Sequence, residues 1–245
     1  MKLVTSGRSY TGDKMNIIAL ITGRGNNTLN NKNILPVNGE PLLSYGAIEA
    51  KKLEDISKYY ISSDDDNILD VGYSLGYEKI KRPAELGTPT ARHGDVVKHA
   101  VQVMDECDIL VVLMANCATI KSSQIKDCID LLKEDESIST VAPVVKDQDH
   151  HPYRTKRIED GFLEPFVPIP DESNSPNRQQ LKPASYFLCH SFYVHRVSKC
   201  FTEDGQPPYF HMGNKVKPYI VDYSLDVHSM EDIYLTEVWI NKEKK

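Results

Sequence analysis

The loop spanning residues 23–33 contains the residues with the clearest potential for chemistry. It carries two cations, Arg24 and Lys32, among glycines and asparagines. Glycine and asparagine tolerate positive φ angles and leave backbone N–H groups exposed. A guanidinium and an ammonium beside such amides suit phosphate oxygens. The loop therefore fits a triphosphate cradle, although it has neither the Walker nor the Rossmann glycine pattern. The alternative is an ordinary surface loop after a buried strand.

Three consecutive acids, Asp64, Asp65 and Asp66, follow the next strongly apolar segment. Acidic side chains at this point can cap the N-terminus of a following helix. They can also bind a cation. The sequence favours capping, because a helical pattern begins at once at Asn67.

Predicted strands and helices alternate over the first 145 residues and would position these loops. The predicted strands span 17–21, 59–63, 108–113 and 139–145, and the predicted helices span 42–52, 67–75, 94–104 and 122–132. Such alternation indicates a mostly parallel sheet with right-handed crossovers. Ligands of these sheets sit beyond the carboxyl ends of the strands. We therefore expect the loops at Gly23, Ser62 and Met114 to open on one rim.

A polar, proline-rich segment from residue 146 to 185 interrupts this alternation. It is too long for an ordinary connection and could be a disordered insertion, a lid or an arm that packs on a partner. A strand over 186–195, a strand over 216–221 and a helix ending near Lys242 are predicted after it. We therefore divide the chain into an extension (1–15), a nucleotide-binding part (16–145), a dimerisation arm (146–185) and a returning part of the α/β domain (186–245).

Composition excludes several classes of protein. Hydrophobic residues make up 40% of the 245 residues and charged residues 26%, as in soluble globular proteins. A net charge of −6 without a basic stripe argues against nucleic-acid binding. No apolar run is long enough to cross a membrane, and the N-terminus has no signal-peptide core. The five cysteines lack zinc-site spacing, which predicts reduced thiols and a cytoplasmic location.

Seven segments, in order, resemble the cytidylyltransferases that activate acidic sugars, the CMP-acylneuraminate and CMP-KDO synthetases. The resemblance covers about residues 16–237. It implies a Rossmann-like α/β fold of the nucleotide-diphospho-sugar transferase type. The segments are Gly23-Arg24-Gly25 with Lys32-Asn33, Gly39-Glu40-Pro41-Leu42, Ser62-Ser63-Asp64-Asp65, Arg82-Pro83-Ala84-Glu85-Leu86 with Thr88-Pro89-Thr90-Ala91, His150-His151-Pro152-Tyr153 with Gly161, Leu163, Pro165 and Phe166, Asn177-Arg178-Gln179-Gln180, and Ser224-Leu225-Asp226-Val227.

The resemblance implies a reaction in which the anomeric hydroxyl of the sugar attacks the α-phosphate of CTP and pyrophosphate leaves. Positioning and charge neutralisation supply most of the catalysis in such a displacement. The implied catalytic residues are Arg24, Lys32 and Asp226. The implied nucleotide-binding residues are Gly23, Gly25, Asn33, Arg82, Thr90 and Ala91.

The resemblance also implies a sugar site and a metal site. Asn116, Arg178 and His228 would contact the sugar, and Arg178 would reach the site of the second subunit of a homodimer through the arm. Asp226 would hold Mg²⁺ or Mn²⁺. His228 could be a second metal ligand, a general base or a residue of the rim. Asp226 could instead cap the last helix together with Ser229.

Four departures from the family pattern fall at the expected active rim. The loop lacks the usual lysine, the third strand ends in Met114-Ala115-Asn116-Cys117-Ala118, the returning strand carries Cys189-His190-Ser191, and His228 replaces a second aspartate. Imidazole is a poorer ligand for Mg²⁺ than carboxylate. Two functions follow. One is an active enzyme with an unusual acidic acceptor sugar, and the other is a catalytically lapsed relative that binds a nucleotide or nucleotide sugar without turnover.

Overall fold

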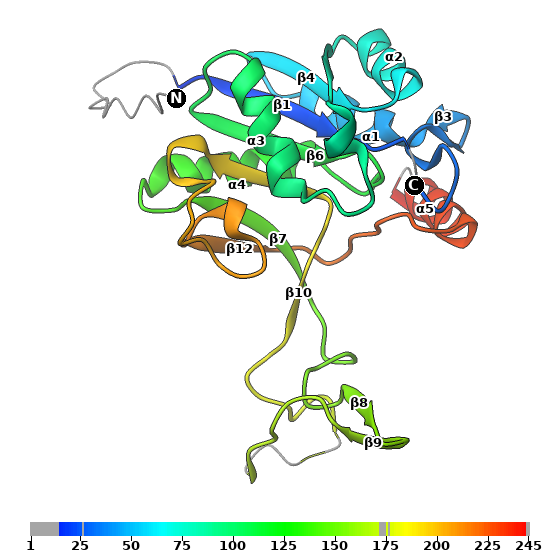
Figure 1. Ribbon diagram of the computed structural model, residues 1–245, viewed down its shortest axis with the longest axis vertical. Helices are drawn as coiled ribbons and strands as arrows, with labels where there is room; N and C mark the ends of the chain where they lie inside the picture. Colours follow the sequence, from blue (N-terminus) through cyan, green and yellow to red (C-terminus); the bar gives the residue numbers. More distant parts are fainter. Residues whose placement is uncertain (1–14, 26, 172–174, 176, 244–245) are drawn as a thin grey trace.

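A mostly parallel sheet forms the body of this computed structural model, which describes residues 15–25, 27–171, 175 and 177–243. Within those residues the sheet has eight strands, in the order β10-β7-β11-β6-β1-β4-β5, and β12 pairs with β7 (Figure 1). The predicted α/β class with a mostly parallel sheet is confirmed. The predicted extension, except for Met15, lies outside the described residues.

The four strands predicted in the first half of the chain are present, whereas the short strand over Glu78–Lys81 was not predicted. The sheet is built from β1 (Ile17–Thr22), β4 (Lys58–Ser63), β5 (Glu78–Lys81), β6 (Ile109–Met114), β7 (Thr140–Lys146), β10 (Tyr186–Leu188), β11 (Phe192–Arg196) and β12 (Val216–Ile220). Two smaller sheets pair β2 (Pro36–Val37) with β3 (Glu40–Pro41), and β8 (Lys156–Glu159) with β9 (Phe162–Pro165).

The helices also lie where the sequence patterns placed them. The α-helices of the described chain are α1 (Leu42–Lys51), α2 (Asp66–Ser74), α3 (His93–Val103), α4 (Ser122–Glu134) and α5 (Met230–Glu243). Asp65 accepts hydrogen bonds from the backbone N–H groups of Asn67, at 2.8 Å, and Ile68, at 3.4 Å. The predicted capping of α2 by the acidic run is therefore confirmed.

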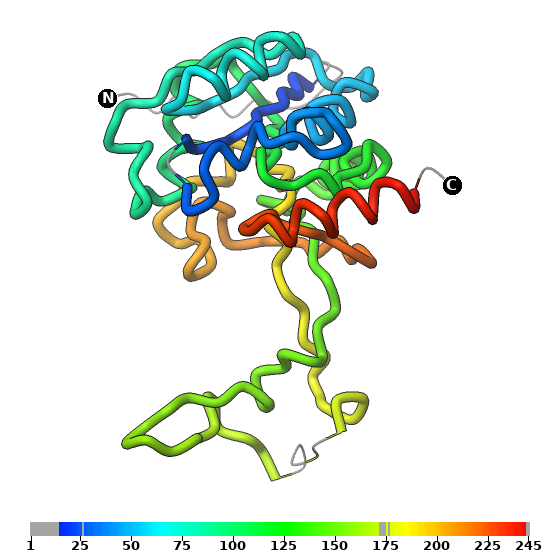
Figure 2. The backbone as a smooth tube through the Cα atoms, turned by 90° about the vertical axis from the view of Figure 1, so that its right-hand side faces the viewer, coloured from blue at the N-terminus to red at the C-terminus, as the bar shows by residue number. Residues whose placement is uncertain are grey.

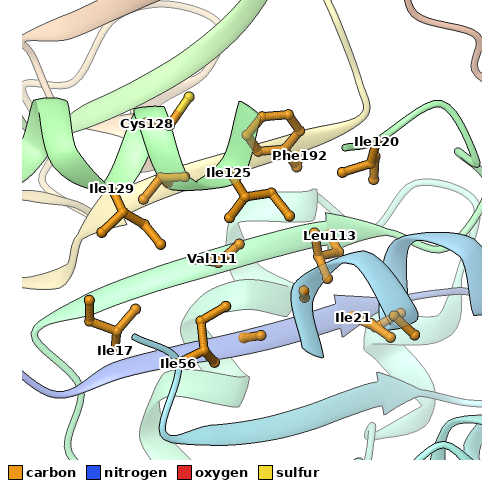
Figure 3. Close-up of a cluster of buried hydrophobic side chains, with 14 of the residues drawn as sticks. Ile17, Ile21, Ile56, Val111, Leu113, Ile120, Ile125, Cys128, Ile129 and Phe192 are labelled. Carbon is orange, nitrogen blue, oxygen red and sulfur yellow. The ribbon is translucent and has the colours of Figure 1, made fainter. Parts of the chain in front are cut away.

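Alternating side chains of β1 fill two cores on opposite faces of the sheet. Ile17 and Ile21 pack with side chains of α1, α2 and α4 on one face, where Ile125 and Ile129 of α4 lie over β6 (Figure 3). Leu20 packs with side chains of α3 on the other face. A strand with both faces buried needs a continuous apolar run, which explains the composition of β1.

The carboxyl ends of the parallel strands meet at one rim. Thr22 at the end of β1 is in register with Ser62 of β4 and Met114 of β6. The loops after β1, β4 and β6 therefore lie side by side, as the sequence predicted. One of the long-range contacts between the third of these loops and the last part of the chain is made by Val227, whose N–H donates to the carbonyl of Asn116 at 3.0 Å.

The strand predicted over 186–195 is divided into β10 and β11. Tyr186 pairs with Lys146 and Val194 pairs with Val141, both antiparallel. Between these pairs the returning chain advances eight residues while β7 advances five, so three residues form a bulge. This bulge lets β11 enter between β7 and β6, where Phe192 is buried.

The segment between β7 and β10 forms an arm that projects far from the body (Figure 1). Its outgoing and returning chains run side by side from the sheet, and the β8–β9 hairpin lies near its far end (Figure 2). The sequence did not predict this hairpin. Of the described cysteines none forms a disulfide. None of the described helices is long and apolar enough to cross a membrane.

Candidate active site

A cavity of about 220 Å³ opens at the carboxyl ends of β1 and β6. It lies where a doubly wound sheet usually binds its ligand. Its walls come from the loop after β1, the segment between β5 and α3, and the end of β6. The lining residues are Thr22, Gly23, Arg24, Asn27, Lys32, Asn33, Arg82, Leu86, Thr88, Ala91, His93, Val96, Met114 and Asn116.

The loop after β1 contributes cations to this cavity. The Arg24 guanidinium donates through Nη1 to the carbonyl of Thr88 at 3.0 Å and through Nη2 to Asn27 Oδ1 at 3.3 Å. Its buried Nε has no hydrogen-bond partner among the described residues. Asn33 Nδ2 donates to the Arg24 carbonyl at 2.9 Å and holds the loop closed. A buried donor without a partner beside a cavity is well placed to bind an anionic ligand.

Lys32 lies in a short 3-10 helix, Lys32–Ile34, that begins after a left-handed Asn31 with φ of 54°. Its Nζ donates to the carbonyl of Val227 at 3.0 Å, which ties the loop to the segment before α5. Burial lowers the pKa of Lys32, Asp226 opposes the change and Arg24 adds to it. A bound phosphate would favour the protonated form of Lys32, because its negative charge opposes the effects of both burial and Arg24 on the pKa.

The segment that follows β5 contributes apolar side chains and a buried guanidinium to the same cavity. Arg82 is 7% exposed and donates to Ser62 twice, from Nε to Oγ at 2.9 Å and from Nη2 to the carbonyl at 2.6 Å. Burial lowers the pKa of Arg82 to about 10, so the group stays protonated at neutral pH. The apolar lining here is Leu86, Ala91 and Val96. Such a wall suits an aromatic ring that also carries hydrogen-bond acceptors.

Asp226 lies beside Asn116, which donates to its carboxylate through Nδ2. His228 Nε2 is 3.0 Å from Asp226 Oδ2. Burial raises the pKa of Asp226, and the neighbouring His228 and Lys32 oppose the rise. The two candidate metal ligands and one candidate sugar-binding residue are thus in direct contact, although 110 residues separate Asn116 from Asp226 in sequence.

Asp226 does not cap α5. Ser229 Oγ accepts from the N–H of Asp232 at 3.3 Å, and the Asp232 carboxylate accepts from the N–H groups of His228 and Ser229 at 2.8 and 2.9 Å. These reciprocal bonds between Ser229 and Asp232 form the cap of the helix. Asp226 is therefore available for another role, and the alternative of helix capping is wrong for this residue.

The donor atoms partly suit a divalent cation. Among the described residues no group of three or more His, Cys, Asp or Glu side chains could hold a metal by itself. Mg²⁺ is commonly held by one or two carboxylates together with substrate phosphates and water. The Asp226 carboxylate fits that arrangement, whereas the imidazole of His228 suits Mg²⁺ poorly and Mn²⁺ better.

Five predicted site residues are not part of the cavity lining: Asp226 and His228, which adjoin it through Asn116, and Thr90, Gly25 and Arg178. Thr90 is exposed, with Oγ1 3.4 Å from that of Thr88. The N–H of Gly25 donates to Asp64 Oδ1 at 3.1 Å. Arg178 lies in the arm and donates to Asp149 Oδ2 at 2.5 Å. The remaining predicted nucleotide-binding residues, Gly23, Asn33, Arg82 and Ala91, all line the cavity.

Sequence reasoning missed His93, the first residue of α3, which lines the cavity and contacts Thr22. Thr22 and Val96 were missed as well. The only local signal for this site residue was the presence of a histidine two residues after Ala91. The sequence does not show whether that side chain faces the cavity. Its position depends on how α3 crosses the sheet.

Comparison with known proteins identifies the family. The profile of the cytidylyltransferase family matches residues 18–160, which is more than half of the chain. The chain belongs to the cytidylyltransferase family. The match includes the cationic loop, Arg82 and the end of β6, so the cavity described above is formed largely by the matched part of this cytidylyltransferase.

Three curated relatives are similar over long stretches. N-acylneuraminate cytidylyltransferase of Oncorhynchus mykiss is 24% identical over 226 residues, which are 89% of this chain and 49% of the relative. The protein of that name from Escherichia coli O18:K1:H7 (strain RS218 / NMEC) is 28% identical over 131 residues, 53% of this chain and 31% of the relative. The chain thus spans less than half of the length of each of these two relatives.

The third relative is 8-amino-3,8-dideoxy-manno-octulosonate cytidylyltransferase of Shewanella piezotolerans (strain WP3 / JCM 13877). It is 24% identical over 200 residues, 81% of this chain and 73% of the relative. All three relatives therefore carry the word cytidylyltransferase in their names, and two of the names contain acylneuraminate.

Solved structures confirm the fold. CMP:2-keto-3-deoxy-manno-octonic acid synthetase complexed with CTP superposes with a TM-score of 0.70 at 12% identity, covering 93% of this chain and 99% of its own. The 4-diphosphocytidyl-2C-methyl-D-erythritol synthase from Anaerococcus prevotii DSM 20548 gives 0.64 at 14% identity, covering 94% and 100%. At such identities the likeness is one of fold.

Proposed function

We propose that this cytidylyltransferase transfers CMP from CTP to the anomeric hydroxyl of an acidic sugar and releases pyrophosphate. The observation that carries the proposal is a cavity lined both by three cations, Arg24, Lys32 and Arg82, and by apolar side chains of the segment that follows β5. A nucleoside triphosphate combines the matching groups, anionic phosphates and an aromatic base. The relatives' names supply the class of acceptor, a nonulosonate or an octulosonate.

The triphosphate would lie along the loop after β1. The Nε of Arg24 has no partner within the described chain and Lys32 is half-buried, so both gain when phosphate oxygens approach. The charge that develops on the departing pyrophosphate is stabilised by these fixed cations, which need no reorganisation during the reaction. The ribose and base would extend toward Ala91 and Arg82.

The acceptor sugar would lie near the end of β6. Asn116 and Asp226 meet there, and His228 is 70% exposed beside them. The attacking sugar hydroxyl must lose a proton as its oxygen bonds to the α-phosphorus, and His228 is placed to take it. A divalent cation held by Asp226, when bound, would supply a Lewis acid for the phosphate oxygens. The alternative role of His228 is that of a second metal ligand. The metal dependence of a His228→Gln variant distinguishes this role from that of proton acceptor.

The arm would join two copies of the chain. Four apolar side chains near its tip are mostly exposed: Ile158 78%, Phe162 72%, Leu163 72% and Phe166 58%. Exposed apolar surface of this extent on a projecting hairpin fits an interface. In such a homodimer Arg178 would offer its charge to the sugar carboxylate in the other subunit. The free cysteines fit a reducing cytoplasmic location.

A measurement of pyrophosphate release tests the proposal. The protein is incubated with CTP, Mg²⁺ or Mn²⁺ and a panel of nonulosonic and octulosonic acids. We expect release with at least one acidic sugar and none with neutral hexoses. Binding of CTP is followed in parallel as a rise in melting temperature, which mass action requires of any ligand of the folded state.

The second candidate is a relative that binds the nucleotide without turnover. It is favoured by the engagement of Asp226 with both Asn116 and His228, which competes with a metal for the carboxylate. Stabilisation by CTP without pyrophosphate release for any acceptor would support it. If CTP neither stabilises the protein nor leads to pyrophosphate release, both candidates are contradicted.

A further inference from the structure

Residues 201–213, which lie between β11 and β12, form a closed strap on the face of the sheet opposite α4. The ends of the strap are joined by a hydrogen bond from the N–H of Phe201 to the carbonyl of His211 at 3.1 Å. Met212 is 2% exposed and packs on β7 and on Tyr193 of β11. The strap therefore covers on this face the two strands that α4 covers on the other.

The strap meets the first turn of α3 at Gly94. A Cβ atom on Gly94 would lie 2.7 Å from the Cβ of His211, which is closer than packed side chains approach. The His211 ring packs edge-to-face on His93, with ring centroids 5.8 Å apart, and lies 6.0 Å from the ring of His195 in β11. Three imidazoles from three elements thus meet beneath the strap.

The surroundings of these imidazoles disfavour a positive charge. The Nε2 atoms of His195 and His211 are buried and have no hydrogen-bond partner among the described residues. Within the same residues no carboxylate hydrogen-bonds to any of the three rings. Burial lowers the pKa of each ring, and His211 lowers the pKa of the other two. All three rings are therefore neutral at pH 7.

Other charged and titratable groups face His211 from the surrounding elements. Asp95 of α3 raises the pKa of His211, whereas His190, in the loop before β11, lowers it. Tyr209 of the strap packs edge-on against the His211 ring, with centroids 6.4 Å apart. The cavity beside the strap is also lined by Arg92, Lys98 and Glu203. Burial outweighs the favourable effect of Asp95, whose side chain is exposed.

His93 connects the strap to the candidate active site. It lines the cavity of that site, where Thr22 Oγ1 is 3.1 Å from its Nε2, and it also lines the cavity beside the strap. We propose that the strap is acid-sensitive: protonation of His211 detaches residues 201–213 from α3 and loosens the wall that His93 forms in the candidate active site. The opening of the strap is independent of the proposed function, whereas its effect on nucleotide binding rests on that function.

The direction of the pH effect follows from the burial of His211. In an open strap the ring would be exposed to water and would have the ordinary histidine pKa of about 6.5. The open form then binds the proton more tightly than the closed form does. The closed strap is therefore fully stable above about pH 6.5, and it loses stability as the pH falls toward the lowered pKa of the closed form.

Hydrogen exchange measured by mass spectrometry tests the strap without any nucleotide. Protection of peptides covering residues 92–100 and 201–213 is compared at pH 7.5 and 5.5, after correction for the intrinsic exchange rate. We expect protection in both peptides to fall several-fold, up to about tenfold, at pH 5.5, since one proton is taken up on opening. Peptides of β6 and α4 should keep their protection. Equal protection at the two pH values, or a loss across the whole chain, would overturn the proposal.

Variants identify the group that titrates. His211→Gln removes the titrating ring but keeps a polar side chain, and it should show equal protection at the two pH values. His150→Gln, which replaces a histidine of the arm whose side chain is 86% exposed, is the matched control and should behave like the unchanged protein. A loss that persists in His211→Gln would contradict the proposal.

Asp95→Asn decides the question if His211→Gln does not fold. It removes the carboxylate that raises the pKa of His211, so the closed form binds the proton less well and the loss at pH 5.5 should deepen. A loss no deeper than in the unchanged protein would contradict the proposal.

Calorimetry of CTP binding tests the link between the strap and the candidate active site. The affinity should fall several-fold more between pH 7.5 and 5.5 in the unchanged protein than in His211→Gln, because protonation of the triphosphate affects both proteins alike. Equal falls would overturn this link. Absence of CTP binding at pH 7.5 would contradict the proposed function, and the exchange experiment would still decide whether the strap opens.

Discussion

The body and the arm of this member of the cytidylyltransferase family use apolar side chains in opposite ways. Phe192 belongs to β11, which lies between β7 and β6 in the body, and its side chain is 1% exposed. Phe162 in the arm hairpin is 72% exposed. Both belong to strands, and both strands are short. The difference is that the body has helices over both faces of its sheet, whereas the two-stranded hairpin has no second layer within the described chain.

The comparison extends to charged groups. Asp226 in the body is partly buried beside the cavity, and desolvation raises its pKa. Asp149 in the arm is exposed, and its hydrogen bond to Arg178 lowers its pKa. The body therefore holds a carboxylate in an unfavourable state where a ligand can compensate it. The arm satisfies its charges by local pairing and leaves its apolar surface open.

The largest expected effect is on stability. Phe192→Ala removes a ring packed against β6 and α4 and should lower the free energy of unfolding by about 3–5 kcal/mol. Phe162→Ala in the arm is the matched control and should change the unfolding of the monomer by less than about 0.5 kcal/mol. Urea denaturation at low protein concentration measures both. Similar losses in the two variants would show that the arm is packed in solution as tightly as the body.

The next effect is on activity. Arg24→Ala should reduce kcat/KM by about 10²–10³-fold and remove most of the stabilisation by CTP, because a preorganised donor to the phosphates is lost. Arg178→Ala serves as the comparison from the arm. It should leave CTP binding unchanged and raise the KM for the sugar, since its charge is expected at the acceptor. A loss of CTP binding in Arg178→Ala would contradict that division.

An effect on assembly should be smaller in free energy and confined to the arm. Replacing Phe162 and Leu163 with serine removes two exposed apolar side chains from the hairpin. Sedimentation should then show a shift from dimer to monomer at micromolar concentration, with an unchanged circular dichroism spectrum. Exchange of the exposed Tyr73 of α2 for serine is the control, because it lies on the body. A dimer that persists in the double variant would place the interface elsewhere.

The smallest effect is in the pH dependence of stability. The pKa of folded Asp226 lies above the unfolded value of about 3.9, so its charge destabilises the fold at neutral pH and this penalty disappears as pH falls through the raised pKa. Asp226→Asn should therefore be more stable than the unchanged protein at pH 7, and the gain should shrink toward pH 4.

Asp149→Asn should behave in the opposite sense. The lowered pKa of Asp149 contributes stability above about pH 3.9, which is lost as pH falls through the folded value. The variant should be slightly less stable at pH 7, and only slightly, because solvent screens an exposed pair. Urea midpoints at pH 7, 5 and 4 measure both variants. Parallel pH profiles would contradict the contrast between the two regions.

Local sequence patterns determined most of the scaffold. The buried run of β1 required a strand covered on both faces, and Asp65 specified the start of α2 because a cap needs only neighbouring N–H groups. The cationic loop was recognisable for the same reason, since its glycines and asparagines act locally. The alternation of strands and helices then fixed which loops share a rim, because parallel strands place their carboxyl ends together.

Tertiary structure alone decided how the site is completed. Three features depend on how elements far apart in sequence cross. They are the contact between Asn116 and Asp226, the position of the Arg24 Nε, which has no partner among the described residues, and the entry of His93 into the cavity. The bulge that divides β10 from β11 also has no local signal, because it follows from pairing with β6 and β7 at once. The type of a residue determines which chemistry its side chain can perform, and tertiary packing determines which groups that side chain contacts.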